Sequence, residues 1–588
     1  MTFYVTRPLR AHALSAAVGS GKTRAAVRWM TSRANAARNF LYIAPTIDLG
    51  AETTVNIDRA LAEAEGPDCR NAHLLNSRNA QGKTRAEALR IVNEVRGEEG
   101  HIQVLTTQTF LDILSGITRP DLWTVILDEA FAPATFETFG LGADVQEGWA
   151  YFSDVFDVDA TSGHRIVPKS GRKTLVADLA DGRLNKAGGK YEGLQKVARA
   201  VANPASRCEL VVTPRVAALM SGAALPARKK EGAESVLEFA SYIAPEYFRD
   251  FREVLFLSAL FEQTVLYKLW TKALGVTFEQ HPEFPVEMLR DTHAEQGRYL
   301  AIGHLLHADD TSSKENLGRN LLTGETGEKH LGERVLDHII KTASVHFDGQ
   351  EFLLQTNNAS GYKEGAALVP CNARLIPAYA HGLNKFQGID NVVALCVTNP
   401  NPQQLAWVRE RTGMSSREVT QSFRIHTAYQ ALGRCSIRRA EATTSLKTVL
   451  VAGIDDAKFL LALFSGAHWV GQVGRLPSLR SLAASNEEKT PGKVEALSEA
   501  ILQYLGKLDV DRIGSKTLKA ALQLTKDTLQ LKVQKVIWPV APQTWSRAVE
   551  LACAPGTGWT KQAGSLVRVS AAAYGFQEQM VAASQAAS

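Results

Sequence analysis

The stretch Ala16–Thr23, which reads AAVGSGKT, constrains the fold of this chain more than any other. The mostly apolar run Ala11–Val18 predicts a short buried strand, and Thr23–Met30 has apolar residues three and four apart, as a helix does. Between them, Gly19 and Gly21 permit a tight turn, which aims backbone N–H groups at a triphosphate. The stretch therefore predicts a strand, a phosphate-binding loop and a helix, the opening unit of an α/β sheet.

The residue types in this loop suit a nucleoside triphosphate and its metal ion. Gly19, Ser20 and Gly21 would cradle the phosphates with their backbone. Lys22 would reach the β- and γ-phosphates, and the Thr23 hydroxyl would ligate Mg²⁺. The alternative is a glycine-rich turn that carries Gly-Lys-Thr by coincidence. Residues 82–84 provide such a case: they also read Gly-Lys-Thr but follow a polar run, so we interpret them as a solvated loop.

Three further apolar runs predict strands, and each of them ends in a polar cluster. They are Phe40–Ala44 before Pro45-Thr46, Ile102–Leu105 before Thr106–Thr109, and Thr124–Leu127 before Asp128-Glu129. Because strand and helix patterns alternate over residues 1–130, we expect a parallel α/β sheet. In such sheets ligands bind at the carboxyl ends of the strands, where these polar clusters stand.

The adjacent carboxylates of Asp128 and Glu129 are the second chemical signal. Asp128 can hold Mg²⁺ through water, and Glu129 can polarise the water that attacks a γ-phosphate. An acidic junction between a strand and a loop is the alternative. The phosphate-binding loop upstream favours the chemical role.

Length and composition restrict the class of protein. At 588 residues the chain is too long for one core, so we expect three to four domains. No apolar run approaches the roughly 20 residues that span a bilayer, no signal peptide is apparent, and the six cysteines form no CxxC pair. These features predict a cytoplasmic protein without a membrane partner. The net charge is +5, and the part from Lys489 onward accounts for all of it.

Eight short motifs follow one another along the chain in a specific order. They read AAVGSGKT (16–23), APT (44–46), TTQT (106–109), DEAF (128–131), SAL (258–260), TNN (356–358), HGLN (381–384) and QALGRCSIR (430–438). In this order they resemble the motifs of superfamily 2 helicases, the DExD/H-box motors. They look most like the divergent helicases of phages and mobile elements. The resemblance covers residues 10–465.

The resemblance implies an α/β fold with two tandem RecA-like parallel-sheet domains and ATP in the cleft between them. We expect the first domain at residues 1–270, with an inserted subdomain at about 135–250, and the second domain at residues 271–480. A small, mostly helical accessory domain is expected at residues 494–588.

The resemblance also implies roles for residues of the ATP site. Lys22, Thr23, Asp128 and Glu129 would come from the first domain. Arg434 and Arg438 would reach across from the second domain as arginine fingers. The remaining expected members are Gln430, which would sense the γ-phosphate, and Gly382 and Asn384 of the HGLN motif.

A second set of residues would contact nucleic acid. The resemblance places Thr46, Thr107 and Thr356 on the opposite lip of the cleft, where they would touch the backbone of one strand. Hydroxyl groups there bind phosphates rather than bases, so we expect no sequence selectivity.

The chain departs from the family pattern at four places. Leu260 replaces the threonine of Ser-Ala-Thr, and Asn384 stands where many relatives carry aspartate. Three residues separate the last two arginines of QALGRCSIR, so either Arg438 or Arg439 could be the second finger. The residues before the phosphate loop contain no convincing adenine-reading glutamine, so the preference for ATP is inferred from the family.

The connection between Phe131 and Ser258 is longer than the core requires, so we expect it to carry its own structure. It contains an aromatic cluster (Trp149, Tyr151, Phe152, Phe156), a loop-like basic run over 169–190 and a predicted strand over 210–213. We hypothesise that it contacts nucleic acid or wedges a duplex open. A structural or partner-binding insertion is the alternative.

The C-terminal part has helical periodicity over 494–508, 516–530 and 543–552, followed by a strand-like run over 565–569. This order suits a winged-helix or helix-turn-helix fold. A basic stripe and three tryptophans favour binding to DNA: Lys516, Lys519, Lys526, Lys532, Lys535, Trp538, Trp545 and Trp559. The alternative is a small helical domain with tryptophans in its core.

Together these patterns predict an ATP-dependent DNA helicase that moves along one strand of single-stranded or forked nucleic acid, with ATP and Mg²⁺ as cofactors. A duplex translocase is one alternative function, because Leu260 replaces the family's threonine. An RNA helicase is a second alternative, because contacts with phosphates do not distinguish ribose from deoxyribose. A nucleotide-switched regulator is the third alternative, although a switch has no need of Glu129 as a general base.

Overall fold

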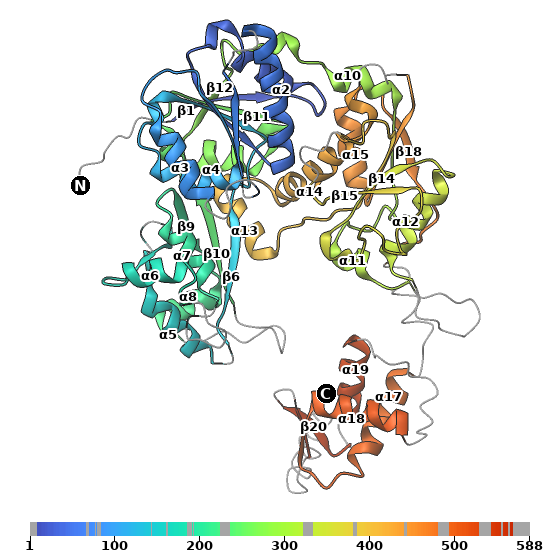
Figure 1. Cartoon of the computed structure of the whole chain (residues 1–588). Helices are drawn as coiled ribbons and strands as arrows, with labels where there is room; N and C mark the ends of the chain where they lie inside the picture. Colours follow the sequence, from blue (N-terminus) through green and yellow to red (C-terminus); the bar gives the residue numbers. More distant parts are fainter. Residues whose placement is uncertain are drawn as a thin grey trace. The chain divides into compact units, whose positions relative to one another are not determined.

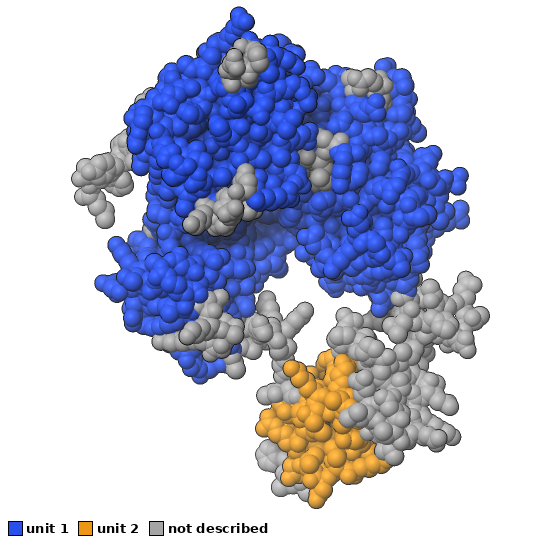
Figure 2. Space-filling model, viewed as in Figure 1, with its two compact units in different colours: residues 1–227, 233–478 blue, residues 228–232, 479–588 orange. Residues whose placement is uncertain are grey.

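A computed structural model of the chain forms two compact units (Figure 2), residues 1–227 with 233–478, and residues 228–232 with 479–588. The structure describes residues 9–65, 70–76, 78, 84–142, 144–159, 161, 163–184, 191, 193–223, 236–321, 333–379, 385–439, 444–479, 493–528, 542–553, 557–562 and 565–568. The predicted motif positions Gly382 and Asn384 lie outside the described residues, as do Gly82 and Lys83 of the second Gly-Lys-Thr.

The first sheet has seven strands, all parallel, in the order β12-β1-β11-β5-β2-β4-β3. Figure 1 shows the green strand β11 lying among blue strands that precede it by more than a hundred residues. The strands are β1 Arg10–Ser15, β2 Asn39–Ala44, β3 Ala72–Leu75, β4 Ile102–Thr106, β5 Trp123–Asp128, β11 Glu253–Ser258 and β12 Thr277–Glu279. Since β12 pairs with β1, this sheet reaches past residue 270.

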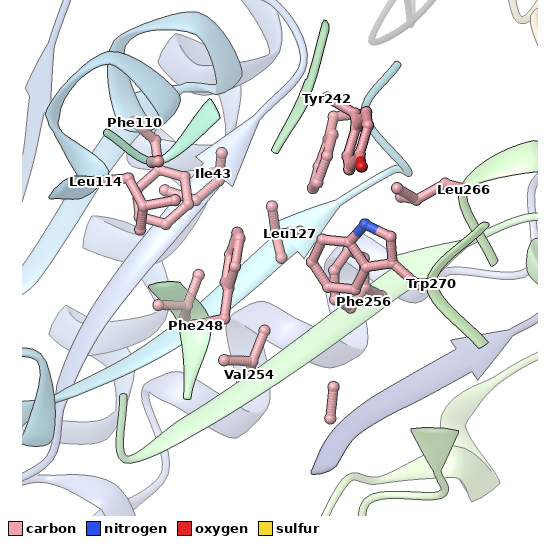
Figure 3. Packing of buried hydrophobic residues seen from close by; sticks show 14 of the residues in the cluster. Ile43, Phe110, Leu114, Leu127, Tyr242, Phe248, Val254, Phe256, Leu266 and Trp270 are labelled. Carbon is pink, nitrogen blue, oxygen red and sulfur yellow. The ribbon is translucent and has the colours of Figure 1, made fainter. Parts of the chain in front are cut away.

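Helices cover both faces of this sheet, and this is why its central strands are apolar at nearly every position. They are α1 Lys22–Met30, α2 Ile47–Glu65, α3 Thr84–Glu94 and α4 Thr107–Ile113. Alternate residues of β2 point to opposite faces: Phe40 and Tyr42 pack with α1 and α2, whereas Leu41 and Ile43 pack on the other side. Figure 3 shows the second of these clusters, where Phe248, Phe256 and Trp270 pack around Leu127.

The long connection after Phe131 forms a second sheet of its own. It has five antiparallel strands in the order β6-β10-β9-β8-β7. Its elements are β6 Thr135–Gly140, α5 Val145–Val155, β7 Phe156–Asp159, β8 Arg165–Pro168, α6 Lys173–Ala180, α7 Gln195–Ala202, β9 Ser206–Leu210, α8 Pro214–Ser221 and β10 Val236–Ile243. We call it the inserted sheet.

The inserted sheet corrects two sequence-based interpretations and shows where the aromatic cluster lies. Phe152 and Phe156 are fully buried in its core and Trp149 packs against that core, so these three aromatic residues stabilise the fold. The basic run is not all loop, because Lys173–Ala180 is a helix, and Arg172 and Arg183 form ion pairs with nearby aspartates. The strand predicted at 210–213 ends at residue 210 and begins at residue 206.

The third sheet is the core of the second α/β domain. It has six parallel strands in the order β15-β14-β16-β17-β13-β18. They are β13 Leu300–His304, β14 Phe352–Gln355, β15 Ala373–Ile376, β16 Asn391–Ala394, β17 Lys447–Val451 and β18 His468–Gln472. The larger helices around it are α12 Val335–His346, α14 Ser416–Leu432 and α15 Ile454–Leu463, whereas α13 Pro402–Thr412, which follows β16 in the chain, packs on the core of the first domain. Two all-parallel sheets in tandem confirm the predicted fold class.

The C-terminal unit is built from helices and a small antiparallel sheet of order β19-β21-β20. Its elements are α17 Lys493–Leu505, β19 Arg512–Gly514, α18 Ser515–Thr528, α19 Pro542–Ala552, β20 Trp559–Gln562 and β21 Ser565–Arg568. Trp545 and Trp559 are buried in its core. Of the predicted basic stripe, the side chains of Lys526, Lys532 and Lys535 lie outside the described residues, as does Trp538. Among the described residues, no helix is long and apolar enough to cross a membrane.

Candidate functional site

The phosphate-binding loop follows β1, which ends at Ser15 and is therefore shorter than predicted. Gly19 and Gly21 have φ angles of +72° and +93°, in the left-handed region that glycine adopts without strain. Lys22 begins α1, and its Nζ donates hydrogen bonds to the carbonyl oxygens of Ala16 and Ala17, at 3.1 and 3.0 Å. Burial lowers the pKa of this ammonium group, and the Glu129 and Asp128 carboxylates oppose that shift. A buried cation at the mouth of a loop of backbone N–H groups suits a phosphate.

Asp128 at the end of β5 lies directly beside this loop. Its Oδ2 accepts a hydrogen bond from the Thr23 hydroxyl at 2.9 Å and another from the Tyr42 hydroxyl. Burial and the neighbouring Glu129 raise the pKa of Asp128, and the hydrogen bonds from Tyr42 and Thr23 lower it. Thr23 and Asp128 are thus adjacent oxygen donors, the kind that Mg²⁺ prefers.

Tyr42 is a member of this site that the sequence reasoning missed. It stands opposite Ile126 in the pairing of β2 with β5, and side chains two residues apart in a strand share a face. The tyrosine hydroxyl therefore reaches Asp128 across the sheet. The one signal in the sequence is a phenol within an otherwise apolar strand.

Glu129 is held by backbone and side-chain contacts from β11. It has a φ of +87°, unusual for a residue other than glycine, and its N–H donates to the carbonyl oxygen of Leu257 at 2.7 Å. The hydroxyl of Ser258 donates to Glu129 Oε2 at 3.2 Å. The serine of the SAL motif therefore orients the expected general base.

The second domain brings the end of α14 against the phosphate-binding loop. The Val18 N–H donates to the Tyr429 hydroxyl at 3.0 Å, and a Cβ added to Gly19 would lie 3.1 Å from Arg438 Cα. Arg434 donates to Gln430 Oε1 at 3.1 Å. Burial and the charge of Arg438 lower the pKa of Arg434 to about 10, so Arg434 keeps its charge at neutral pH.

These residues line one cavity of about 500 Å³, within the range of small-molecule sites. The predicted residues among its walls are Gly19, Gly21, Lys22, Thr23, Asp128, Glu129, Gln430, Arg434 and Arg438. Arg438 lines the cavity and Arg439 is exposed, which favours Arg438 as the second finger. Helix α2 adds residues that the motifs did not indicate: Glu52, Thr53, Asn56 and Arg59.

Unpartnered polar atoms test whether this cavity suits a phosphorylated ligand. Within the described part of the chain, Ser20 Oγ, Gln430 Nε2 and Arg434 Nε are buried without a hydrogen-bond partner. Buried polar atoms are normally paired, because an unmade hydrogen bond costs about 1–3 kcal/mol. A nucleoside triphosphate and Mg²⁺ fit this set of donors and carboxylates.

The three threonines expected to contact nucleic acid lie outside this cavity. Thr46 and Thr107 follow the paired strands β2 and β4, and Thr107 Oγ1 donates to the carbonyl oxygen of Ala44 at 3.3 Å. Thr46 Oγ1 accepts from the N–H of Leu49 at the start of α2. Thr356 follows β14 in the other domain and is hydrogen-bonded to Ser360. The structure brings together Thr46 and Thr107, and it places Thr356 in the second domain.

Comparison with known proteins agrees with the motifs. Residues 6–132 match the family model described as DEAD/DEAH box helicase. No curated protein matches the chain in sequence. The match confirms the resemblance to superfamily 2 helicases, and residues 6–132 are the part of the chain that is similar to DEAD/DEAH box helicases. The narrower likeness to helicases of phages and mobile elements stays a prediction.

Similar solved structures include three proteins of this kind. A point variant of Dbp5 from S. cerevisiae, bound to RNA and ADP BeF3, has 10% identity over 82% of this chain and 88% of its own, with a TM-score of 0.31. A DEAD box protein from the hyperthermophile Methanococcus jannaschii has 9% identity over 78% and 85%, with a TM-score of 0.23. The DUF1998 helicase MrfA, bound to DNA and AMPPNP, has 9% identity over 82% and 55%, with a TM-score of 0.28.

Proposed function

We propose that this chain is an ATP-dependent DNA helicase, which couples ATP hydrolysis to movement along one strand and to unwinding of the duplex. The helicase family of residues 6–132 is one of ATP-dependent motors on nucleic acid. One observation carries the proposal. A single cavity is lined by Lys22, Asp128 and Glu129 from the first α/β domain and by Arg434 and Arg438 from the second.

The chain's own residues suggest how hydrolysis proceeds. Lys22 binds the β- and γ-phosphates, and Glu129, oriented by Ser258, accepts a proton from the water that attacks the γ-phosphorus as the bond to ADP breaks. Arg434 stabilises the charge that develops on the transferred group. Mg²⁺, held through Thr23 and Asp128, would neutralise charge on the phosphates. Because both α/β domains line the site, each cycle of ATP binding and hydrolysis can change how the two domains contact a nucleic-acid strand.

The first test is steady-state ATP hydrolysis without polymer and with single-stranded DNA, duplex DNA or single-stranded RNA, followed by strand displacement on a forked duplex. We expect strong stimulation by single-stranded DNA and displacement of the paired strand. Stimulation by RNA alone would make the chain an RNA helicase, and hydrolysis with no polymer response would contradict a motor.

One observation favours a duplex translocase as the second candidate. Leu260 replaces the hydroxyl that the family pattern has after Ser-Ala, and its side chain packs against the apolar core of the second domain. Stimulation by duplex DNA without strand displacement would select this function.

We also propose that residues 494–588 form an accessory DNA-binding domain. Two cations lie over its core tryptophans: Lys519 Nζ is 5.6 Å from the ring centre of Trp545, and the Arg568 guanidinium is 5.4 Å from that of Trp559. A chain that ends at residue 479 should then bind DNA more weakly than the full chain in a fluorescence anisotropy titration. Equal affinity would contradict this role.

Tyr42→Phe should weaken the binding of the Mg²⁺ ion that supports ATP hydrolysis. A hydrogen bond to a charged group contributes about 1.5–3 kcal/mol, so losing the one to Asp128 should raise the Mg²⁺ concentration for half-maximal hydrolysis about tenfold. Because that hydrogen bond lowers the pKa of Asp128, the acid limb of the pH–rate profile should move to higher pH.

The measurement is hydrolysis as a function of Mg²⁺ and of pH. Tyr362→Phe is the matched control, because the Tyr362 hydroxyl also donates to a carboxylate, that of Asp337, but away from the cavity. Equal Mg²⁺ dependence in the wild type and Tyr42→Phe would show that Tyr42 does not support Mg²⁺ binding.

A further inference from the structure

Helix α13 belongs to the second domain by sequence but packs on the first domain. It lies in the chain between β16 and β17 of the third sheet. Its Trp407 and Val408 are nevertheless buried in the apolar cluster that includes Phe256 and Trp270 of the first domain. The Trp407 ring also meets Phe136 of the inserted sheet edge-on, at 5.6 Å between centroids. The helix therefore joins the two domains (Figure 1).

A buried carboxylate of the inserted sheet holds this helix. Glu209 on β9 has a side chain only 5% exposed. Its Oε2 accepts hydrogen bonds from Trp407 Nε1 at 3.1 Å and from the Arg411 guanidinium at 2.8 Å. Its Oε1 accepts from the Tyr242 hydroxyl at 2.6 Å. Three donors thus meet one buried charge, and two of them come from α13.

A second contact fixes the beginning of α13. Asn401 caps the helix through a capping box with Gln404, and its Nδ2 donates to Glu238 Oε1 of the inserted sheet at 2.9 Å. At the other end, Arg411 also donates to the carbonyl oxygen of Gly163. Both ends of α13 are therefore hydrogen-bonded to the inserted sheet.

Helix α14 continues from α13 to the nucleotide cavity. Its first half packs on the first domain: Val419 lies in that domain's core, and Ser422 Oγ accepts from the N–H of Val265 at 3.0 Å. Its last turn carries Tyr429 and Gln430. Its 17 residues span about 25 Å, and Arg434 follows two residues beyond its end. A helix of this length transmits a displacement of one end to the other.

We propose that Glu209 is a positioning residue for Arg434 and Arg438, acting through α13 and α14. The inserted sheet then sets where the arginine pair stands relative to the phosphate-binding loop. This role rests on the ATPase proposed above. It also gives the insertion a function that does not require contact with nucleic acid.

The test compares ATP hydrolysis by Glu209→Gln and by wild-type full-length protein. The substitution removes the negative charge that pairs with Arg411. It also introduces an amide NH₂ group, a hydrogen-bond donor, where Tyr242, Trp407 and Arg411 already donate. Misplacing a catalytic group by about 1 Å can cost about a hundredfold in rate, so we expect kcat to fall about ten- to hundredfold. The KM for ATP and the affinity for a fluorescent ATP analogue should change less than about twofold, because Lys22 and Thr23 stay in place.

Matched variants separate this role from a general loss of stability. Glu253→Gln removes a carboxylate that also pairs with an arginine, Arg38, but lies within the first domain, and its kcat should stay within about twofold of wild type. In an Arg434→Ala background, Glu209→Gln should lower kcat by a smaller factor than it does in the wild type, since the part of its effect that acts through Arg434 is already lost.

A variant that fails to fold is replaced by two milder ones. Arg411→Met removes one donor to Glu209, and Asn401→Asp keeps the helix cap but places a carboxylate beside Glu238. Each variant should lower kcat and leave the KM for ATP nearly unchanged. Its thermal unfolding midpoint should stay close to that of the wild type.

The outcomes distinguish the two proposals. Wild-type protein that hydrolyses no ATP would overturn the proposed function itself. An active wild type with an unchanged kcat in the Glu209, Arg411 and Asn401 variants would overturn only the positioning role. A full additional loss in the Arg434→Ala background, or unfolding of all three variants, would also overturn it, because Glu209 would then act on stability alone.

Discussion

Lys22→Ala is expected to lower kcat/KM for ATP by about 10²–10³-fold, the effect of removing one charged donor from a preorganised site. The Lys22 ammonium already points into the phosphate-binding loop, where it donates to the carbonyl oxygens of Ala16 and Ala17. Alanine keeps the loop but removes the cation, so that the β- and γ-phosphates lose their main counter-charge. The measurement is steady-state hydrolysis together with binding of a fluorescent ATP analogue.

The fold should tolerate this change. Burial lowers the pKa of Lys22, which means that the folded protein holds this charge at a cost. Removing it is therefore expected to leave the thermal unfolding midpoint unchanged or slightly raised. Lys83→Ala, in the second Gly-Lys-Thr, is the control and should hydrolyse ATP like wild type. If hydrolysis survives Lys22→Ala but is lost in Lys83→Ala, the phosphate site lies at residues 82–84 and not at residues 16–23.

Glu129→Gln should separate ATP binding from turnover. A general base contributes about 10²–10⁴-fold, so kcat should fall by about 10³-fold. The amide oxygen of the introduced glutamine can still accept the hydrogen bond that the Ser258 hydroxyl gives to Glu129, and Lys22 and Thr23 are untouched. Affinity for the ATP analogue should therefore stay within about twofold of wild type.

Single-turnover hydrolysis with protein in excess over ATP is the decisive measurement for Glu129→Gln, because it follows the chemical step without product release. Glu253→Gln, which alters a carboxylate at the opposite ends of the strands, serves as the control. Normal single turnover in Glu129→Gln would show that another group takes the proton. Loss of analogue binding would instead make Glu129 a binding residue.

The central strands of the first sheet could be predicted from local patterns, although β1 ends at Ser15 rather than Val18. The apolar runs Phe40–Ala44 and Thr124–Leu127 lie within β2, which begins one residue earlier, and β5, which extends one residue further at each end. A strand covered on both faces must be apolar nearly throughout, so composition alone indicates it. The basic run over 169–190 shows the limit of this reasoning: its charges suggested a loop, yet α6 forms there because Val176 and Leu179 pack inward.

The candidate site was predictable where its residues are close in sequence or carried by a known motif. The loop 16–23 and the pair Asp128-Glu129 each bring their groups together through local backbone geometry. Tyr42 and Ser258 belong to no contiguous pattern with the groups they hold, and only the pairing of β2 and β11 with β5 brings them there. The burial of Phe152 and Phe156 could not be predicted either, because an aromatic cluster has the same sequence pattern in a core as on a surface.

The sequence by itself determined the two parallel α/β domains, the phosphate-binding loop and the order of the motifs, because apolar periodicity, glycine and short motifs act over a few residues. The tertiary structure alone decided that Tyr42 holds Asp128, that α13 of the second domain is buried in the first, and that Glu209 meets Trp407 and Arg411 about 200 positions later. Such contacts depend on strand register and helix packing, and these are set by the whole core rather than by any one segment.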